Sequence, residues 1–206
     1  MSIHRRLRHL KLATSPPLRP YHNSTAMTSL YDQSVVPSVK YLKNLSAILE
    51  KGRAFADGKG KAHDEILNFR LIEDMRGLTY QVQAACNTVE FLLPRLAGIE
   101  KTHFPDDEKT FAELQDRIGK TIEIVQDPKV RPAMEGKEKQ PILMPTKSMG
   151  TYRFETGEKY VVGYAMANFH FHYSTAYCIL RHLGVPISAF DYLGKDTFVK
   201  VDDASK

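Results

Sequence analysis

The sequence predicts an all-α domain, a four-helix bundle with a small β-hairpin between its third and fourth helices. After Met27, apolar residues recur every three or four positions over four long stretches, which is the period of a helix buried along one side. Residues 128–156 lack this period and contain two short β-like runs. Four amphipathic helices bury their apolar stripes best against one another, so these patterns together predict a bundle.

The first helix is expected to begin near Leu30. Pro37 either kinks it or marks its proper start, because proline suits a first turn and not a helix interior. Gly52 and the glycine-rich stretch 57–61 are expected to end it, and residues 63–70 are expected to form a short turn of helix.

The second helix is predicted over about 71–96, where one apolar stripe continues for seven turns. Pro94 removes a backbone hydrogen bond from the last turn and is expected to fray or bend it. Gly98 then ends the helix.

The third helix has a clear start, because Thr110 and Glu113 fit a capping box, and Asp127-Pro128 stops it. Residues 142–144 and 152–154 are predicted to form the hairpin, as a covering flap. The fourth helix is predicted over about 158–183 and is terminated by Gly184-Val185-Pro186.

Three segments are expected: an N-terminal extension (1–26), the bundle domain (27–196) and a C-terminal tail (197–206). The extension carries five arginine and lysine residues and no acid, which is typical of a mitochondrial transit peptide. The alternative is a mis-assigned start, with Met27 as the first residue of the protein. The expected location is therefore mitochondrial or cytoplasmic.

Composition excludes several classes of protein. The net charge of +5 comes from the extension, since 29 basic residues less those five leave 24 against 24 acids. No basic stripe marks the predicted helices, so no nucleic-acid partner is expected. No stretch is apolar enough for a membrane span. Cys86 and Cys178 are expected to be buried free thiols.

Polar residues on otherwise apolar stripes are the candidate site. Asn168 and His172 lie four apart on the fourth helix, so both face the same way, and the apolar residues that follow His172 at helical spacing predict that it points into the bundle. Gln83 shares a face with Asn87 on the second helix. A small polar pocket lined by Gln83, Asn168 and His172 is therefore the leading hypothesis. The alternatives are a hydrogen-bonded core histidine and a solvated helix flank.

Separated blocks of the chain resemble a known family. SLYDQSVVP, RLIEDM with QVQAACN, RLAGIE, TFAELQDRIGKT and NFHFHYSTAYCILRHLGV occur in this order between residues 29 and 185. They resemble the domain of unknown function 1993 (DUF1993) family, grouped with the DinB/YfiT-like bundles. The resemblance extends to Gly194 and favours Met27 as the start, since such proteins begin close to an S-L-Y-D motif.

The resemblance implies a DinB-like bundle, often dimeric. Many relatives hold a divalent metal with three histidines, one on the second helix and two on the last, and some are thiol-dependent transferases or isomerases. Carried over, these ligand positions fall on His172, on Asn168 and near Gln83. Two of the three would be amides, which are poor zinc ligands. A zinc or nickel ion on His172 is thus at most a weak site, and no tightly held cofactor is expected.

Two functional hypotheses follow. The first is an uncharacterised DinB-like bundle that binds an unknown small molecule in its polar pocket, with a degenerate metal site related to that of thiol-dependent transferases. The second is a non-catalytic bundle that acts through homodimerisation or partner binding. Large enzyme classes with phosphate-binding glycine loops, nucleophile elbows or H-E-x-x-H motifs are disfavoured, because those motifs are absent. Whether the protein is an enzyme stays open.

Overall fold

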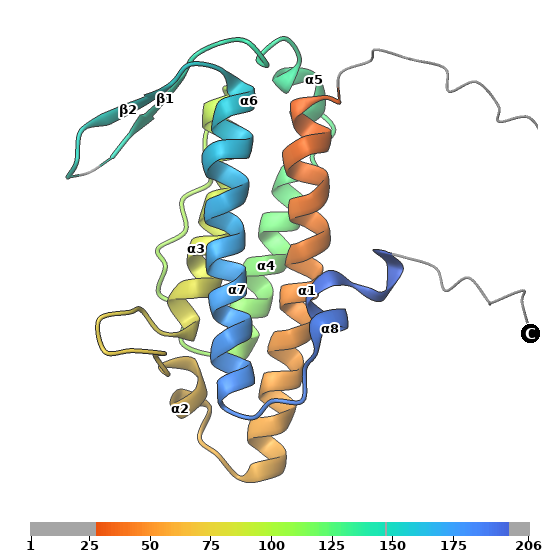
Figure 1. Cartoon of the computed structure of the whole chain (residues 1–206), viewed down its shortest axis with the longest axis vertical. Helices are drawn as coiled ribbons and strands as arrows, with labels where there is room; N and C mark the ends of the chain where they lie inside the picture. The colour runs from red at the N-terminus through yellow and green to blue at the C-terminus, as the bar shows by residue number, and fades with distance from the viewer. Residues whose placement is uncertain (1–27, 147, 198–206) are drawn as a thin grey trace, which may run out of the picture.

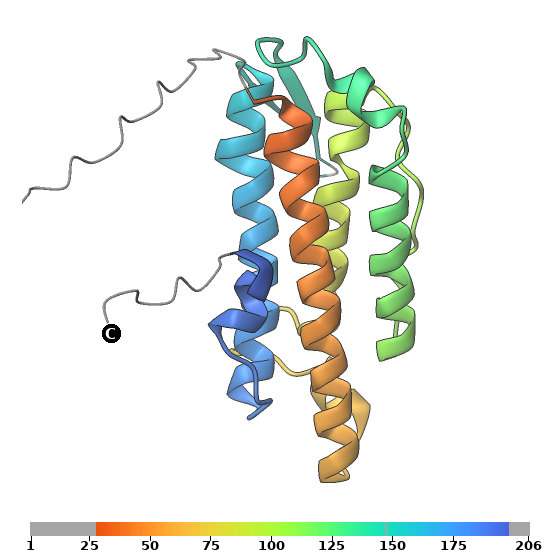
Figure 2. The same ribbon diagram turned by 90° about the vertical axis from the view of Figure 1, so that its right-hand side faces the viewer.

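In the computed structural model, which describes residues 28–146 and 148–197, four long helices lie side by side (Figures 1 and 2). They are α1 (Leu30–Lys59), α3 (Leu78–Glu90), α4 (Phe111–Val125) and α7 (Met166–His182). The predicted all-α four-helix bundle is confirmed. The predicted extension lies outside the described residues, as does all but the first residue of the predicted tail.

Helix α1 begins where the sequence predicts and ends within the glycine-rich stretch 57–61 that was predicted to end it. The Asp32 amide donates to Ser29 Oγ at 3.1 Å, so the helix starts at Leu30 and continues through Pro37. The expected stop at Gly52 is wrong. A Cβ at Gly52 would lie 2.8 Å from Leu180 Cδ2, so this glycine lets α1 and α7 approach closely. The left-handed Gly60, within the predicted stretch 57–61, ends the helix.

The second long helix starts later than predicted. The predicted short turn is present as α2 (His63–Leu67), but residues 71–77 are not helical, and α3 begins at Leu78. The apolar stripe was misleading at this point because Leu71 and Ile72 are exposed to solvent. Gly77 precedes the helix, where a Cβ would lie 2.9 Å from the Asn68 carbonyl oxygen.

The end of that helix and the start of the next agree with the sequence. The π-helical turn η1 (Leu93–Ala97) accommodates Pro94, and Gly98 follows in the left-handed conformation. The capping box that starts α4 is formed: the Glu113 amide donates to Thr110 Oγ1, and the Thr110 amide donates to Glu113 Oε2.

The region predicted to be non-helical contains one short helix, α5 (Val130–Met134), besides the predicted hairpin. Strands β1 (Ile142–Pro145) and β2 (Thr151–Phe154) pair antiparallel, with Met144 opposite Tyr152. Helix α6 (Gly157–Tyr160) and the π-helical turn η2 (Val161–Ala165) then lead directly into α7. The prediction that this region is free of helix is therefore wrong, and the hairpin is confirmed.

The predicted stop of the fourth helix is also confirmed. Gly184 has a φ of 93°, and the Val185 amide donates to the Leu180 carbonyl at 3.1 Å. Helix α8 (Ala189–Leu193) and the 3-10 turn η3 (Lys195–Thr197) follow, and α8 packs on α1. Within the described residues, no helix combines the length and apolarity that a membrane crossing requires.

The path of the chain places an irregular segment beside α3. Helices α3 and α4 run in the same direction, so the chain must return along the bundle between them (Figure 2). Successive residues of segment 100–109 accordingly contact earlier and earlier residues of α3: Lys101 contacts Asn87 and Glu90, and Glu108 contacts Gln83. This segment forms one wall of the candidate site.

Candidate functional site

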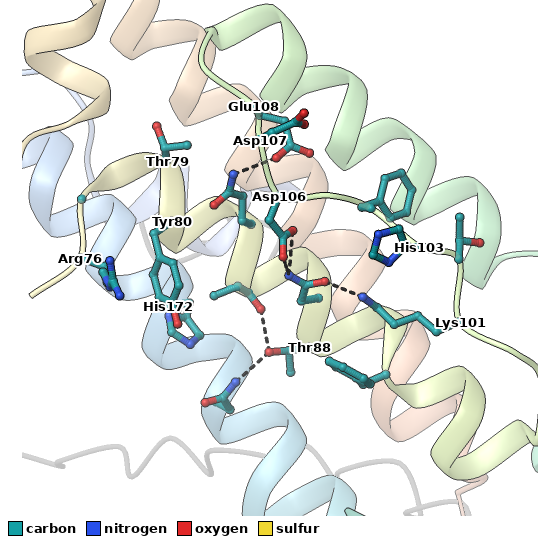
Figure 3. A pocket seen from close by; sticks show the side chains of 18 of the residues that line it. Arg76, Thr79, Tyr80, Thr88, Lys101, His103, Asp106, Asp107, Glu108 and His172 are labelled. Atoms are coloured by element: carbon teal, nitrogen blue, oxygen red, sulfur yellow. Dashed lines mark hydrogen bonds between the residues drawn. The ribbon is translucent and has the colours of Figure 1, made fainter. Parts of the chain in front are cut away.

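A groove of about 1220 Å³ runs along α3, between α7 and segment 100–109. Figure 3 shows Arg76, Tyr80 and His172 together at one part of the site and Lys101 and His103 at another. The residues of α3 and its C-cap, Phe91, that line it recur at helical spacing: Thr79, Tyr80, Gln83, Ala84, Asn87, Thr88 and Phe91. From the opposite side come Asn168 and His172 of α7 and Tyr164 of the preceding turn η2. The three predicted pocket residues therefore all line one space, which is a long groove and not the small pocket predicted.

The His172 imidazole is held in one tautomer. Its Nδ1 lies 2.8 Å from Gln81 Oε1, and the Gln81 amide nitrogen donates to the Arg76 carbonyl at 2.9 Å. Because a carbonyl only accepts, the amide nitrogen of Gln81 must face Arg76 and its oxygen must face His172. Nδ1 therefore carries the proton, and Nε2 keeps a lone pair.

The lone pair of Nε2 faces the groove. His172 is 9% exposed, and its side chain is hydrogen-bonded to a described residue only through Nδ1. Nε2 is also not among the fully enclosed atoms without a partner, so it retains contact with solvent. Burial lowers the pKa of His172, which favours the neutral imidazole at neutral pH. The predicted inward orientation of His172 is what the structure has, with Gln81 as its partner.

Asn168 is also fixed in orientation. Its Nδ2 donates to Thr88 Oγ1 at 2.7 Å, and the Thr88 hydroxyl donates to the Ala84 carbonyl at 2.8 Å. Since the hydroxyl proton is used on Ala84, Thr88 accepts from Asn168, and the Asn168 amide cannot be turned around. Its Oδ1 has no hydrogen-bond donor among the described residues.

Gln83 bonds to the opposite wall. Its Nε2 donates to Glu108 Oε2 at 2.8 Å, and a carboxylate oxygen can only accept, so Gln83 Oε1 is left for the groove. Gln83 is 7% exposed and Gln81 is 2% exposed. The interpretation of these second-helix amides as a solvated flank is therefore wrong.

Beneath segment 100–109 lies an ionic network that the sequence analysis missed. Arg117 of α4 is 2% exposed, and its guanidinium donates to Glu90, Asp106 and Glu108 at 3.2, 3.0 and 2.9 Å. It also donates to Asn87 Oδ1 at 3.0 Å. Segment 100–109 is thus fastened to α3 and α4 by charged side chains.

Glu90 is the most enclosed member of this network. It is fully buried, its Oε1 accepts from Thr121 at 2.9 Å, and its Oε2 has Lys101 Nζ at 3.5 Å without a hydrogen bond. Burial raises the pKa of Glu90, while Arg117 opposes that rise. A signal was present in the sequence: Glu90 is four residues after Cys86, and Arg117 three after Leu114, so both fall on core-facing positions.

The two cysteines are free and differ in environment. Cys86 is buried in the core, and burial raises the pKa of its thiol to about 12, so it is inert at neutral pH. Cys178 is exposed, so the prediction that both thiols are buried is wrong for Cys178.

Comparison with known proteins assigns the family. The family model described as Domain of unknown function (DUF1993) matches residues 30–193. This chain belongs to the DUF1993 family. Its structure is similar to the crystal structure of a DinB family member protein from Shewanella denitrificans, with a TM-score of 0.74 and 35% sequence identity over 84% of this chain and 96% of that chain. No curated protein matches the chain.

In this DUF1993 protein, the donors at the three positions expected for a metal do not form a histidine centre. His172 offers Nε2, in the arrangement that a metal-binding histidine usually has. Asn168 and Gln83, however, offer only amide oxygens, which zinc and nickel bind poorly. Among the described residues, no three histidine, cysteine, aspartate or glutamate side chains gather in a way that could hold a metal ion. The residues at these positions do not fit the metal that the resemblance implies.

Proposed function

We propose that this DUF1993 protein binds a small organic ligand in the groove between α3, α7 and segment 100–109. Gln83, Asn168 and His172 would contact the ligand. The observation that carries the proposal is His172 Nε2, an unprotonated nitrogen on a side chain that is 91% buried, directed to a groove large enough for a small molecule. An acceptor that is bonded to no described residue and still reaches solvent is available to a hydrogen-bond donor on a ligand.

A neutral imidazole with an accessible lone pair can also act as a general base. The proposed relation to thiol-dependent transferases is that, of the three metal-ligand positions of such relatives, one holds a histidine here, His172, and the other two hold the amides Asn168 and Gln83. Any proton transfer in this protein would use His172 Nε2, with Gln81 holding the ring in position.

Binding in the groove is tested by blocking it. Ala84 lines the groove, and Ala84→Trp would place an indole there. Fragments that bind the wild-type chain in ligand-observed NMR are expected to lose saturable binding to Ala84→Trp. Ala167→Trp is the matched control, since Ala167 is exposed on α7 and does not line the groove. Equal binding to wild type and Ala84→Trp would exclude the groove as the ligand site.

Metal content is the second test. The wild-type chain and His172→Ala would be dialysed mildly and analysed by mass spectrometry for zinc and nickel. We expect substoichiometric metal in both proteins, because amide oxygens complete a weak ligand set. Stoichiometric metal in the wild type that is lost in His172→Ala would contradict the proposal of a degenerate site, because it would show that His172 is a ligand of a tightly bound metal.

A second candidate function, association as a homodimer, is favoured by exposed apolar side chains on neighbouring elements. Val36 of α1 is 49% exposed and Val162 of η2 is 66% exposed, and these two elements pack against each other. Size-exclusion chromatography with light scattering is expected to show a dimer at micromolar concentration and a shift toward monomer in Val162→Glu. A wild-type monomer at that concentration would contradict this candidate.

A further inference from the structure

The groove presents three hydrogen-bond acceptors whose orientation is fixed by the hydrogen bonds behind them. Gln83 Oε1 is left facing it because Glu108 binds the amide nitrogen, and Asn168 Oδ1 because Thr88 binds the amide nitrogen. His172 Nε2 is an acceptor because Gln81 holds the proton on Nδ1. None of the three can turn an acceptor away from the groove without breaking a bond of 2.8 Å or less. Gln83 and Asn168 each also keep a second amide N–H, whereas His172 presents only an acceptor.

The charged groups beside these acceptors disfavour a cation. Asp106 and Glu108 are each paired with Arg117, and Lys101 binds Asn87 and lies near Glu90. Among the other charged residues that line the groove, Arg76, Glu100 and Asp107 have no ion pair with a described residue, but all three are exposed, so solvent screens their charges. An ammonium group held by neutral acceptors would lose its hydration without gaining a counter-ion, which is costly.

The same acceptors disfavour an anion. A carboxylate or phosphate oxygen placed here would face two amide oxygens and an imidazole lone pair, and it could accept only from the second amide N–H of Gln83 or Asn168. A neutral group that carries N–H donors avoids both penalties and satisfies acceptors that otherwise have water as their partner.

We propose that the groove recognises an uncharged ligand group that donates N–H hydrogen bonds, such as a carboxamide or an amino group on an aromatic ring. The inference rests on the proposed function, that the groove binds a ligand, and adds the ligand's chemical class. The selectivity for this group comes from the three fixed acceptors on the facing helices α3 and α7. A loss of one such hydrogen bond costs about 1 kcal/mol, which corresponds to a fivefold weaker Kd.

The test uses four probes that share one ring: benzamide, N,N-dimethylbenzamide, benzoate and benzylammonium. Their binding to the full chain would be measured by ligand-observed NMR titration at constant ionic strength. We expect benzamide to bind at least fivefold more tightly than each of the other three. Equal or tighter binding of dimethylbenzamide, benzoate or benzylammonium overturns the proposal.

Exchanging one acceptor provides a sharper test. Asn168→Asp replaces the amide by a carboxylate of the same size, and the Thr88 hydroxyl can turn to donate to it. The preference is expected to move from benzamide toward benzylammonium in this variant. Asn44→Asp is the matched control, because Asn44 donates to the Tyr192 carbonyl away from the groove, and it should leave the order of the probes unchanged.

The outcomes separate the two proposals. If fragments bind the wild type and are lost in Ala84→Trp, but benzamide has no advantage or Asn168→Asp leaves the order unchanged, the N–H donor proposal is wrong and the groove remains the ligand site. If Ala84→Trp binds all fragments as the wild type does, the proposed function is wrong. The N–H donor proposal is then wrong as well, because any benzamide binding would take place outside the groove.

Discussion

Arg117→Met is expected to destabilise the protein by about 3–5 kcal/mol, the usual cost of removing one partner from a buried ion pair. Arg117 donates to three carboxylates and an amide while it is 2% exposed. Its loss leaves Glu90 buried with Thr121 as its remaining hydrogen-bond donor. Urea denaturation followed by circular dichroism measures the change.

Removing both partners should cost much less than the two single changes predict. In Arg117→Met combined with Glu90→Leu, no buried charge of this pair is left without its partner, and well-packed apolar replacements of such pairs are often neutral. The coupling energy of the double-mutant cycle is expected to be at least about 2 kcal/mol, in line with contacting residues of one network. Additive single losses would show that the two residues do not act as a pair.

An exposed pair supplies the matched control. Arg131 and Asp32 also form a two-bond contact, but both side chains are open to solvent. Arg131→Met should therefore change the denaturation midpoint far less than Arg117→Met. A similar loss in both variants would mean that burial is not the cause.

The same substitution also bears on the groove. Segment 100–109 has no strand or helix of its own and is held by Arg117, Lys101 and Gln83 through side chains. Proteolytic cleavage within this segment is expected to be faster in Arg117→Met before the helices unfold, because the side-chain contacts that hold the segment are lost while the core remains.

The sequence predicted the helices because each buries a continuous apolar stripe, and it predicted their ends wherever a cap has a local signature, as at Thr110 and Gly184. The predicted helix ends were wrong where a tertiary contact, and not a local motif, determines the end of the helix. Gly52 has the same local appearance as a helix stop, yet it is the point where Leu180 packs against α1. Leu71 continues the stripe of α3, yet it lies in an exposed loop.

The candidate site was predictable only in part, for a related reason. The orientation of His172 follows from helical period, but its partner does not: Gln81 and Gln83 are adjacent polar residues, and helix rotation decides that Gln81 meets His172. The groove wall was not predictable, because an irregular segment such as 100–109 has no period. Its position depends on the parallel direction of α3 and α4, which is a property of the whole chain (Figure 2).

His172→Gln is expected to make stability less sensitive to acid. Burial lowers the folded-state pKa of His172 below its unfolded value of about 6.5. Below that value the unfolded chain binds a proton that the folded chain does not, so the free energy of unfolding falls as pH drops from about 6.5 toward the folded-state pKa. One such proton contributes at most about 1.4 kcal/mol per pH unit. Glutamine keeps a donor for Gln81 and does not titrate.

Denaturation midpoints measured between roughly pH 7 and pH 5 test this directly. The curve of His172→Gln should be flatter than that of the wild type. His170→Gln is an informative companion, because burial also lowers the pKa of His170, which lies against Tyr41 with its Nδ1 3.2 Å from the Tyr192 hydroxyl. The two variants should flatten the curve independently, since the side chains point to different sides of α7. Curves of equal slope for wild type and His172→Gln would mean that His172 is already charged, or open to water, in the folded protein. In the first case Nε2 would have no lone pair, and in the second burial would not control the ring.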